Sequence, residues 1–185
     1  IKKIENYIDS DKKYFILRFS ELGAYHDDGI KGISDEVAEK IIYKLKPHGN
    51  IYISSEKKMS DNFEKYRMKI RSSDMHHFMA FSSMVIGDSQ TMSAESAVLG
   101  VPFIRYNDFV GRLSYCHSLE NTYNLGYGIK AGNTKLLFKK IDELLNMQER
   151  EDVFQKRRAK MLNDKINYSD FLFGFINDYQ NKIVC

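Results

Sequence analysis

The chain has 185 residues and a formal net charge of +3, with 43% hydrophobic and 29% charged residues. This size and balance predict one folded domain, or at most two small ones, and so weak a charge gives no electrostatic reason to expect nucleic acid as a partner. The two cysteines, Cys116 and Cys185, form no C-x-x-C pair, so neither a zinc site nor a disulfide framework is predicted, and a reducing cytoplasm is the expected location.

The start of the chain, at Ile1, has no initiator methionine, and a helix-like lead-in precedes the first predicted strand. We interpret the sequence as a fragment of a longer chain, with a processed protein as the alternative. No signal peptide is recognisable, and no apolar run approaches the roughly 20 residues that cross a bilayer. We therefore expect no transmembrane segment.

The first 150 residues alternate between strand-like and helix-like patterns. Residues 14–19 (YFILRF) predict a strand because they are aromatic and β-branched, and a polar loop follows at 20–32. Ser34 is expected to cap the first amphipathic helix. Further strands are predicted at 51–55, 67–70, 83–87, 101–104 and 127–129, with helices at 73–81, 90–99, 112–123 and from 134 onward. This alternation predicts a three-layer, Rossmann-like α/β fold, with a largely parallel sheet and helices on both faces.

After residue 150 the alternation stops, and residues 151–185 predict two further helices, one basic and one aromatic. The aromatic helix carries a stripe at helical spacing that is too apolar to face water. The stripe consists of Tyr168, Phe171, Leu172, Phe175, Ile176 and Tyr179. We expect it to pack on its own domain, on a second copy in a homodimer, or on a domain that the fragment lacks.

Two loops are the candidate ligand-binding segments, because open α/β sheets bind ligands at the carboxyl ends of their strands. These are residues 20–32 and 87–91, and the second leads directly into a helix whose first amides favour an anion such as phosphate. Ser89 would cap this helix or donate its hydroxyl to the ligand. Glu95, further along the same helix, is suited to accept hydrogen bonds from two ribose hydroxyls. The alternative is that Ser89 only caps the helix and Glu95 is merely solvated.

The histidines and the standard nucleotide-binding motifs say less about the site than these two loops do. His26 lies in the first loop, where it would transfer protons, contact phosphate or bind a metal, or simply belong to a polar loop. His76 and His77 are adjacent and point roughly 100° apart on a helix, which is poor geometry for joint metal ligation. Neither G-x-G-x-x-G nor a P-loop is present, so no cofactor and no metal are predicted.

Residues 83–105 resemble the nucleotide-binding half of GT-B fold enzymes. The pattern is most similar to a prokaryotic domain-of-unknown-function family related to UDP-N-acetylglucosamine 2-epimerases. The epimerase pattern has D-S, then a glutamate, then L-G-x-P and a strand that ends in arginine. In this chain the D-S is matched by Asp88-Ser89 and the glutamate by Glu95. The L-G-x-P is matched by Leu99-Gly100-Val101-Pro102, and the arginine by Arg105. The patterns "RFSELGAYHDDG", "ISSE" and "GRLSY" extend the likeness to that family over about residues 14–145.

The resemblance implies that residues 1–150 are the C-terminal, Rossmann-like domain of a GT-B protein, with a UDP-sugar as substrate and an N-terminal domain as the missing partner. Ser89 would touch the pyrophosphate, Glu95 the ribose, and the uracil would lie near the chain entering the helix at 73–81. The implied nucleotide site consists of Arg71, Ser72, Ser89, Gln90, Thr91, Met92 and Glu95, with His26 as the catalytic candidate.

Two reactions remain open within this interpretation: glycosyl transfer and sugar-nucleotide 2-epimerisation, either of them serving surface glycan synthesis. The epimerases carry H-R-R-E-N after the first strand, where this chain has residues 22–26 (LGAYH), so the sequence does not choose between them. The alternative function is a non-catalytic nucleotide-sugar sensor or assembly module on the same fold.

Overall fold

A five-stranded parallel sheet forms the centre of the computed structural model, which describes residues 4–5, 7–8, 12–21 and 29–183, with side chains up to residue 179. The strand order is β2-β1-β3-β4-β5. The strands are β1 (Tyr14–Phe19), β2 (Asn50–Ser55), β3 (Met84–Gly87), β4 (Phe103–Tyr106) and β5 (Gly126–Ile129). All the pairings between neighbours are parallel, as the alternation of the sequence predicts.

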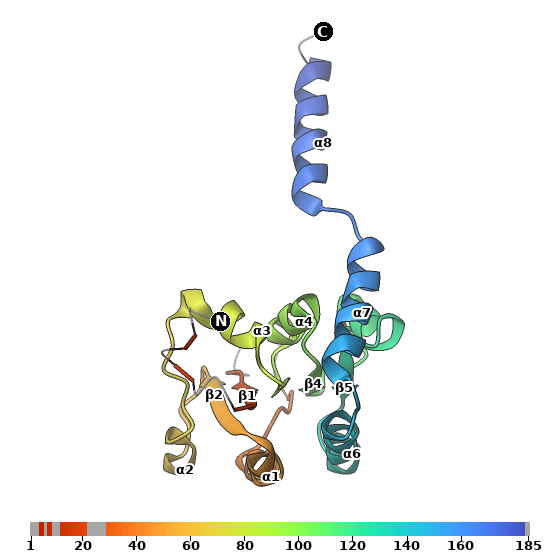
Figure 1. Cartoon of the computed structure of the whole chain (residues 1–185). Coiled ribbons are helices and arrows are strands. Elements are labelled where there is room, and N and C mark those ends of the chain that lie inside the picture. The colour runs from red at the N-terminus through yellow and green to blue at the C-terminus, as the bar shows by residue number, and fades with distance from the viewer. Residues whose placement is uncertain (1–3, 6, 9–11, 22–28, 184–185) are drawn as a thin grey trace.

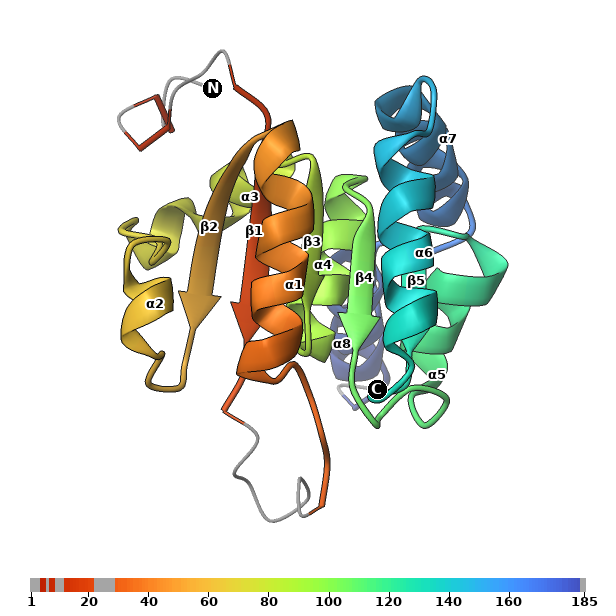
Figure 2. The ribbon, with the colours of Figure 1, turned by 90° about the horizontal axis from the view of Figure 1, so that it is seen from below.

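Helices cover both faces of the sheet, so the predicted three-layer architecture is confirmed (Figure 1, Figure 2). One face carries α1 (Asp35–Leu45) and α6 (Thr134–Leu145), and the other carries α3 (Met75–Ala80), α4 (Gln90–Leu99) and α7 (Arg150–Asn163). Two single-turn helices, α2 (Asp61–Glu64) and α5 (Ser114–His117), complete the body. Because the strands are covered on both sides, successive residues of β1 such as Phe15, Ile16 and Leu17 are all buried.

The first helix forms as its sequence predicts. The Ser34 hydroxyl accepts a hydrogen bond from the Val37 N–H at 3.3 Å, which satisfies one of the unpaired donors at the start of α1. The predicted stripe on its inner face is buried against the sheet: Val37, Ile41, Ile42 and Leu45. On its outer face Lys40 pairs with Glu36 one turn away.

The strand predicted at residues 67–70 does not form. Only Arg67 makes a bridge, to Ile53 at the outer edge of the sheet. The segment is short because helix α2 ends just before it, with Arg67 paired to Glu64, and a 3₁₀ turn at Ser72–Asp74 follows it. The helix predicted at 112–123 likewise divides into α5 and a π-helical turn, Ser118–Thr122.

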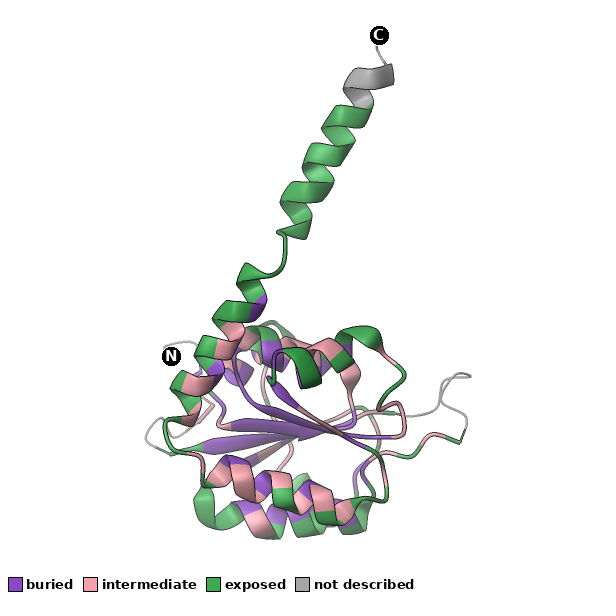
Figure 3. Cartoon of the chain, turned by 90° about the vertical axis from the view of Figure 1, so that its right-hand side faces the viewer, coloured by how far each residue is buried: buried purple, intermediate pink, exposed green. Residues whose placement is uncertain are grey.

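The two last helices differ in how they contact the body. Phe154 and Met161 of α7 are buried, and the Gln155 side-chain amide donates to the Leu99 carbonyl at the end of α4 at 3.1 Å. By contrast α8 (Tyr168–Ile183) stands away from the body, and its described side chains are all exposed (Figure 3). The aromatic stripe thus does not pack on its own domain, while a second copy or an absent domain stays a prediction.

No helix within the described residues is long and apolar enough to cross a membrane.

Candidate functional site

The order of the strands identifies one edge of the sheet as the candidate site. From β1 the chain crosses to β2 on one side, and from β3 it continues through β4 to β5 on the other side. The strand order therefore reverses between β1 and β3, and open α/β sheets bind ligands outside the carboxyl ends of such a pair. The two loops that the sequence selects, residues 20–32 and 87–91, leave these two strand ends.

Asp88 holds the base of the first loop together. Its side chain is fully buried, and its two carboxylate oxygens accept the N–H of Ser20 at 2.7 Å and the N–H of Ile33 at 3.2 Å. Burial raises the pKa of the Asp88 carboxyl, and the two N–H bonds act in the opposite direction. One carboxylate thus fixes both ends of the loop to the end of β3, a role that the sequence did not reveal.

Ser89 caps α4, as predicted. Its hydroxyl oxygen accepts the Met92 N–H at 3.3 Å, and its carbonyl accepts the Ser93 hydroxyl at 2.7 Å. The hydroxyl proton of Ser89 remains available as a donor to a ligand. Gln90 is half-buried and Thr91 is exposed, so both lie at the open start of the helix, whereas the Met92 side chain is buried beneath it.

Glu95 has a partner on the neighbouring helix. Its Oε2 lies 3.5 Å from Nε2 of His76 on α3, and its side chain is 34% exposed. The contact is an ion pair only when the imidazole is protonated. Glu95 is therefore not merely solvated: it is a half-buried carboxylate placed between two helices, and His76 is a site residue that sequence reasoning missed.

Arg71 and Ser72 lie just before α3, which covers the same face of the sheet as α4. The Arg71 guanidinium binds the Asp74 carboxylate, with Nε to Oδ2 at 3.0 Å, and Asp74 also accepts the Tyr7 hydroxyl at 3.1 Å. The Arg71 side chain nevertheless stays 76% exposed. Since His76 joins α3 to Glu95, the structure brings the residues predicted for base, ribose and phosphate to one side of the sheet.

A buried polar cluster lies behind this surface. Arg105 donates from Nε and Nη2 to Oε1 of Glu120, at 2.9 and 2.7 Å, and from Nη1 to the Asn107 side chain at 3.1 Å. The Asn107 amide donates in turn to the Asp88 carbonyl at 2.7 Å. Burial raises the pKa of the Glu120 carboxyl, and Arg105 opposes that shift. The cluster of Asp88, Arg105, Asn107 and Glu120 ties the ends of β3 and β4 to the turn before β5.

Two weak signals for this cluster can be found in the sequence. Arg105 interrupts an otherwise apolar strand, and Gly128 stands inside the strand predicted at 127–129. The structure gives the reason for this glycine, because a Cβ atom there would collide with the Glu120 carboxylate. Neither signal names Asn107 or Glu120 as partners, because the contacts join segments that the fold alone brings together.

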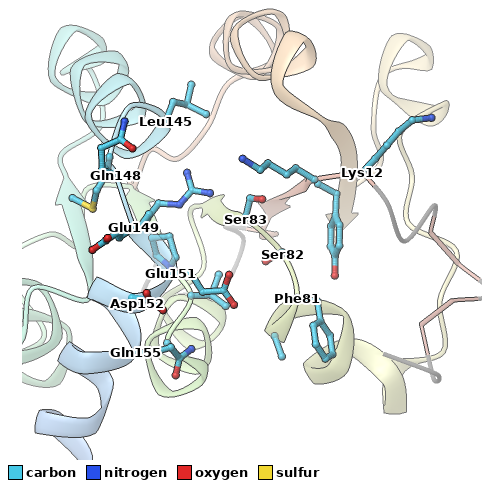
Figure 4. A pocket seen from close by; sticks show the side chains of 18 of the residues that line it. Lys12, Phe81, Ser82, Ser83, Leu145, Gln148, Glu149, Glu151, Asp152 and Gln155 are labelled. Atoms are coloured by element: carbon cyan, nitrogen blue, oxygen red, sulfur yellow. The ribbon is translucent and has the colours of Figure 1, made fainter.

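Two pockets open at opposite edges of the sheet. The larger, of about 760 Å³, lies at the amino edge, and Figure 4 shows its lining side chains coming from the start of β1, the turn before β3 and the link from α6 to α7. Its charges are mixed, with Lys12 on one side of the opening and Glu149, Glu151 and Asp152 on the other. The smaller, of about 540 Å³, lies at the carboxyl edge. If pocket size alone were used, the candidate site would be placed at the amino edge. Open α/β sheets bind ligands at the opposite edge, outside the carboxyl ends of their strands.

His26 and the neighbouring Asp27 and Asp28 lie outside the described residues, so the predicted catalytic group stays a prediction. Within the described part of the chain, no three histidine, cysteine or acidic side chains gather closely enough to hold a metal ion.

Comparison with known families fits this geometry. A family model described as "Protein of unknown function (DUF354)" matches residues 1–178. The chain belongs to the DUF354 family. A comparison with functionally curated proteins finds no match for this DUF354 chain.

Solved structures similar to this DUF354 chain include glycosyltransferases and a protein described as an epimerase. The forosaminyltransferase SpnP of spinosyn synthesis has a TM-score of 0.56 at 13% identity, and the match covers 83% of this chain and 40% of SpnP. UGT71G1 of Medicago truncatula, solved with UDP-glucose, has a TM-score of 0.55 at 13% identity, with 90% and 39% covered. A Listeria monocytogenes protein described as a UDP-N-acetylglucosamine 2-epimerase has a TM-score of 0.50 at 16% identity, with 82% and 41% covered.

These likenesses show the fold: an α/β domain of the GT-B type. This DUF354 chain spans about two fifths of the length of the structures it matches, with 42% of a rhamnosyltransferase, SpnG, covered in the same way.

Proposed function

We propose that this DUF354 chain is the nucleotide-sugar-binding half of a GT-B glycosyltransferase or sugar-nucleotide 2-epimerase that acts in surface glycan synthesis. Its substrate would be a UDP-sugar, and an N-terminal domain outside this chain would complete the active site. The observation that carries the proposal is Glu95, a half-buried carboxylate on the helix that Ser89 caps at the point where the strand order reverses.

The chemistry of each group supports the assignment. The Ser89 hydroxyl and the first N–H groups of α4 suit a phosphate, because helix starts present unpaired donors and a partial positive charge. The Glu95 carboxylate suits the two hydroxyls of a ribose, since bonds to a charged acceptor are stronger than neutral ones. Arg71 and Ser72, before the neighbouring helix, would meet the base.

The catalytic role is assigned to the loop at residues 20–32. Asp88 fixes Ser20 and Ile33, at the two ends of this loop, next to Ser89, where the phosphate would bind, and this supports His26 as the proposed proton donor or acceptor. Transfer and 2-epimerisation share this arrangement, and the missing domain would supply the groups that decide between them. The same site without a catalytic partner would make the protein a nucleotide-sugar sensor in the cytoplasm.

A thermal-shift panel of UDP-, GDP-, CMP- and dTDP-sugars tests the binding. We expect a UDP-sugar to raise the Tm most, by roughly 5–10 °C at a concentration of one hundred times Kd. UGT71G1, which has the same fold, was solved with UDP-glucose, and this favours uridine as the base. No Tm change with any of the four nucleotides would reject the proposal. Binding by the full-length protein without turnover would favour the sensor.

A further inference from the structure

The pocket at the carboxyl edge lies beside the nucleotide site on the side of β4 and β5. Its volume is about 540 Å³, and three segments that are far apart in sequence form it. These are the returning limb of the first loop, the turn after β4, and the residue that follows β5, all at one edge of the sheet (Figure 2). The lining residues are Gly29, Ile30, Asp108, Val110, Gly111, Arg112 and Lys130.

The walls of this pocket are held by defined contacts. Lys31 and Asp108 exchange two hydrogen bonds: the Lys31 N–H donates to Oδ2 of Asp108 at 3.0 Å, and the Asp108 N–H donates to the Lys31 carbonyl at 3.1 Å. The Asn107 side chain accepts the Phe109 N–H at 3.0 Å and belongs to the buried cluster below. The first loop and the turn after β4 are therefore fastened to each other at the pocket.

The pocket has a surplus of positive charge. Arg112 and Lys130 are both exposed in it, and neither forms an ion pair with a carboxylate of the described residues. The Arg112 guanidinium lies 5.9 Å from the centre of the Phe109 ring, a contact that leaves its N–H groups for another acceptor. The one acid in the lining, Asp108, already accepts the Lys31 N–H.

We propose that Arg112 and Lys130 bind a phosphate or diphosphate group of the substrates in this pocket. An arginine fork and a lysine ammonium are the side chains that proteins use to hold such anions, and a diphosphate that leaves a sugar needs its charge stabilised. The inference rests on the proposed function, because the anion is either the diphosphate of the sugar nucleotide or a phosphate carried by the acceptor.

Calorimetry with three ligands separates these sources. Inorganic pyrophosphate, UDP and uridine are titrated into the wild-type chain, the double variant Arg112→Gln/Lys130→Gln, and a control, Lys156→Gln, on an exposed position of α7. We expect the double variant to lose tenfold or more in pyrophosphate affinity, with the control unchanged. The loss should shrink at high salt, where exposed charges are screened.

The pattern across the ligands identifies the bound group. A parallel loss for UDP with uridine unchanged assigns the pocket to the diphosphate of the donor. A loss for pyrophosphate with UDP unchanged assigns it to the acceptor. If uridine and UDP do not bind while pyrophosphate binds through Arg112 and Lys130, the proposed function fails and the anion pocket stands.

Unchanged pyrophosphate and UDP affinities in the double variant would overturn the pocket, as would a wild-type chain that binds neither ligand. Because both side chains are exposed, the Tm of the double variant should match that of the wild type, so a loss of binding cannot be attributed to unfolding.

Discussion

Two sets of polar side chains make up the candidate site and its support, and they differ in burial. Asp88, Arg105, Asn107 and Glu120 are buried and satisfy one another across three segments of the chain. The second set, which stays partly or largely exposed, consists of Ser89, Glu95, His76 and Arg71, each with a side-chain or backbone partner close by. The first set fixes the shape of the edge, whereas the second offers atoms that a ligand can still reach. Variants in the two sets should therefore separate stability from binding.

The largest effect is expected when one charge of the buried pair is removed. Glu120→Gln leaves the Arg105 guanidinium buried without a counter-charge, so the free energy of unfolding should fall by about 3–5 kcal/mol. Urea denaturation measures this loss. The double variant Arg105→Met/Glu120→Leu should recover much of it, because no unpaired charge remains. If Glu120→Gln lowers the free energy of unfolding by less than about 1 kcal/mol, the cluster does not stabilise this edge of the sheet.

The opposite result is expected for Glu95. Glu95→Gln keeps the shape of the side chain but removes its charge, so UDP-sugar affinity should fall on the order of tenfold or more. The free energy of unfolding should stay within about 0.5 kcal/mol. Calorimetry gives the affinity, and Glu39→Gln, on the exposed face of α1, is the control for a lost surface carboxylate. Equal affinities with a collapsed Tm would make Glu95 a structural residue.

Ser89 is expected to contribute both to stability, as a helix cap, and to ligand binding. A second serine cap in the same chain, Ser34, provides a matched control. Ser89→Ala should cost about 1 kcal/mol of stability through the lost cap and should also weaken UDP binding. Ser34→Ala removes a cap with the same 3.3 Å geometry at the start of α1, on the face of the sheet opposite α4. We expect the two variants to lose similar stability in thermal unfolding, and only Ser89→Ala to lose affinity. Equal affinities in both would restrict Ser89 to its capping role.

The smallest effect is expected at His76. The pair with Glu95 is largely exposed, and such pairs contribute less than about 1 kcal/mol. His76→Gln should therefore lower nucleotide affinity less than fivefold, by leaving the Glu95 carboxylate less well positioned. His77→Gln, the next residue along α3, is the control, and calorimetry compares the two. A tenfold loss in His76→Gln would instead indicate a direct contact with the nucleotide.

Sequence patterns predicted the parts of the molecule that depend on nearby residues. The strand at 14–19, the Ser34 and Ser89 caps and the alternation of elements follow from local composition, and the positions of the two loops follow from that alternation. The segment at 67–70 has strand-like composition but lies at an outer edge, where α2 and a 3₁₀ turn limit it to one bridge. The composition of this segment does not show that a helix and a turn lie on either side of it.

The partners within the site were beyond prediction for a related reason. The contacts from Arg105 to Glu120 and from Glu95 to His76 join separate elements, so they exist only once the sheet has formed. The sequence does show an arginine in an apolar strand and a glutamate in a small-residue helix. It does not show which side chains meet them.

The double attachment of the first loop to Asp88 has a consequence for how the protein can diversify. Because Ser20 and Ile33 both bind one carboxylate, the two ends of the loop are held together by the rest of the fold. The distance between these ends therefore does not depend on the residues between them. The entropy of closing a loop grows slowly with its length, by only about 0.6 kcal/mol for each doubling. Insertions between these two attachment points, away from the Lys31–Asp108 contact, should thus alter the stability of the domain little, so this loop can vary in length on an unchanged framework.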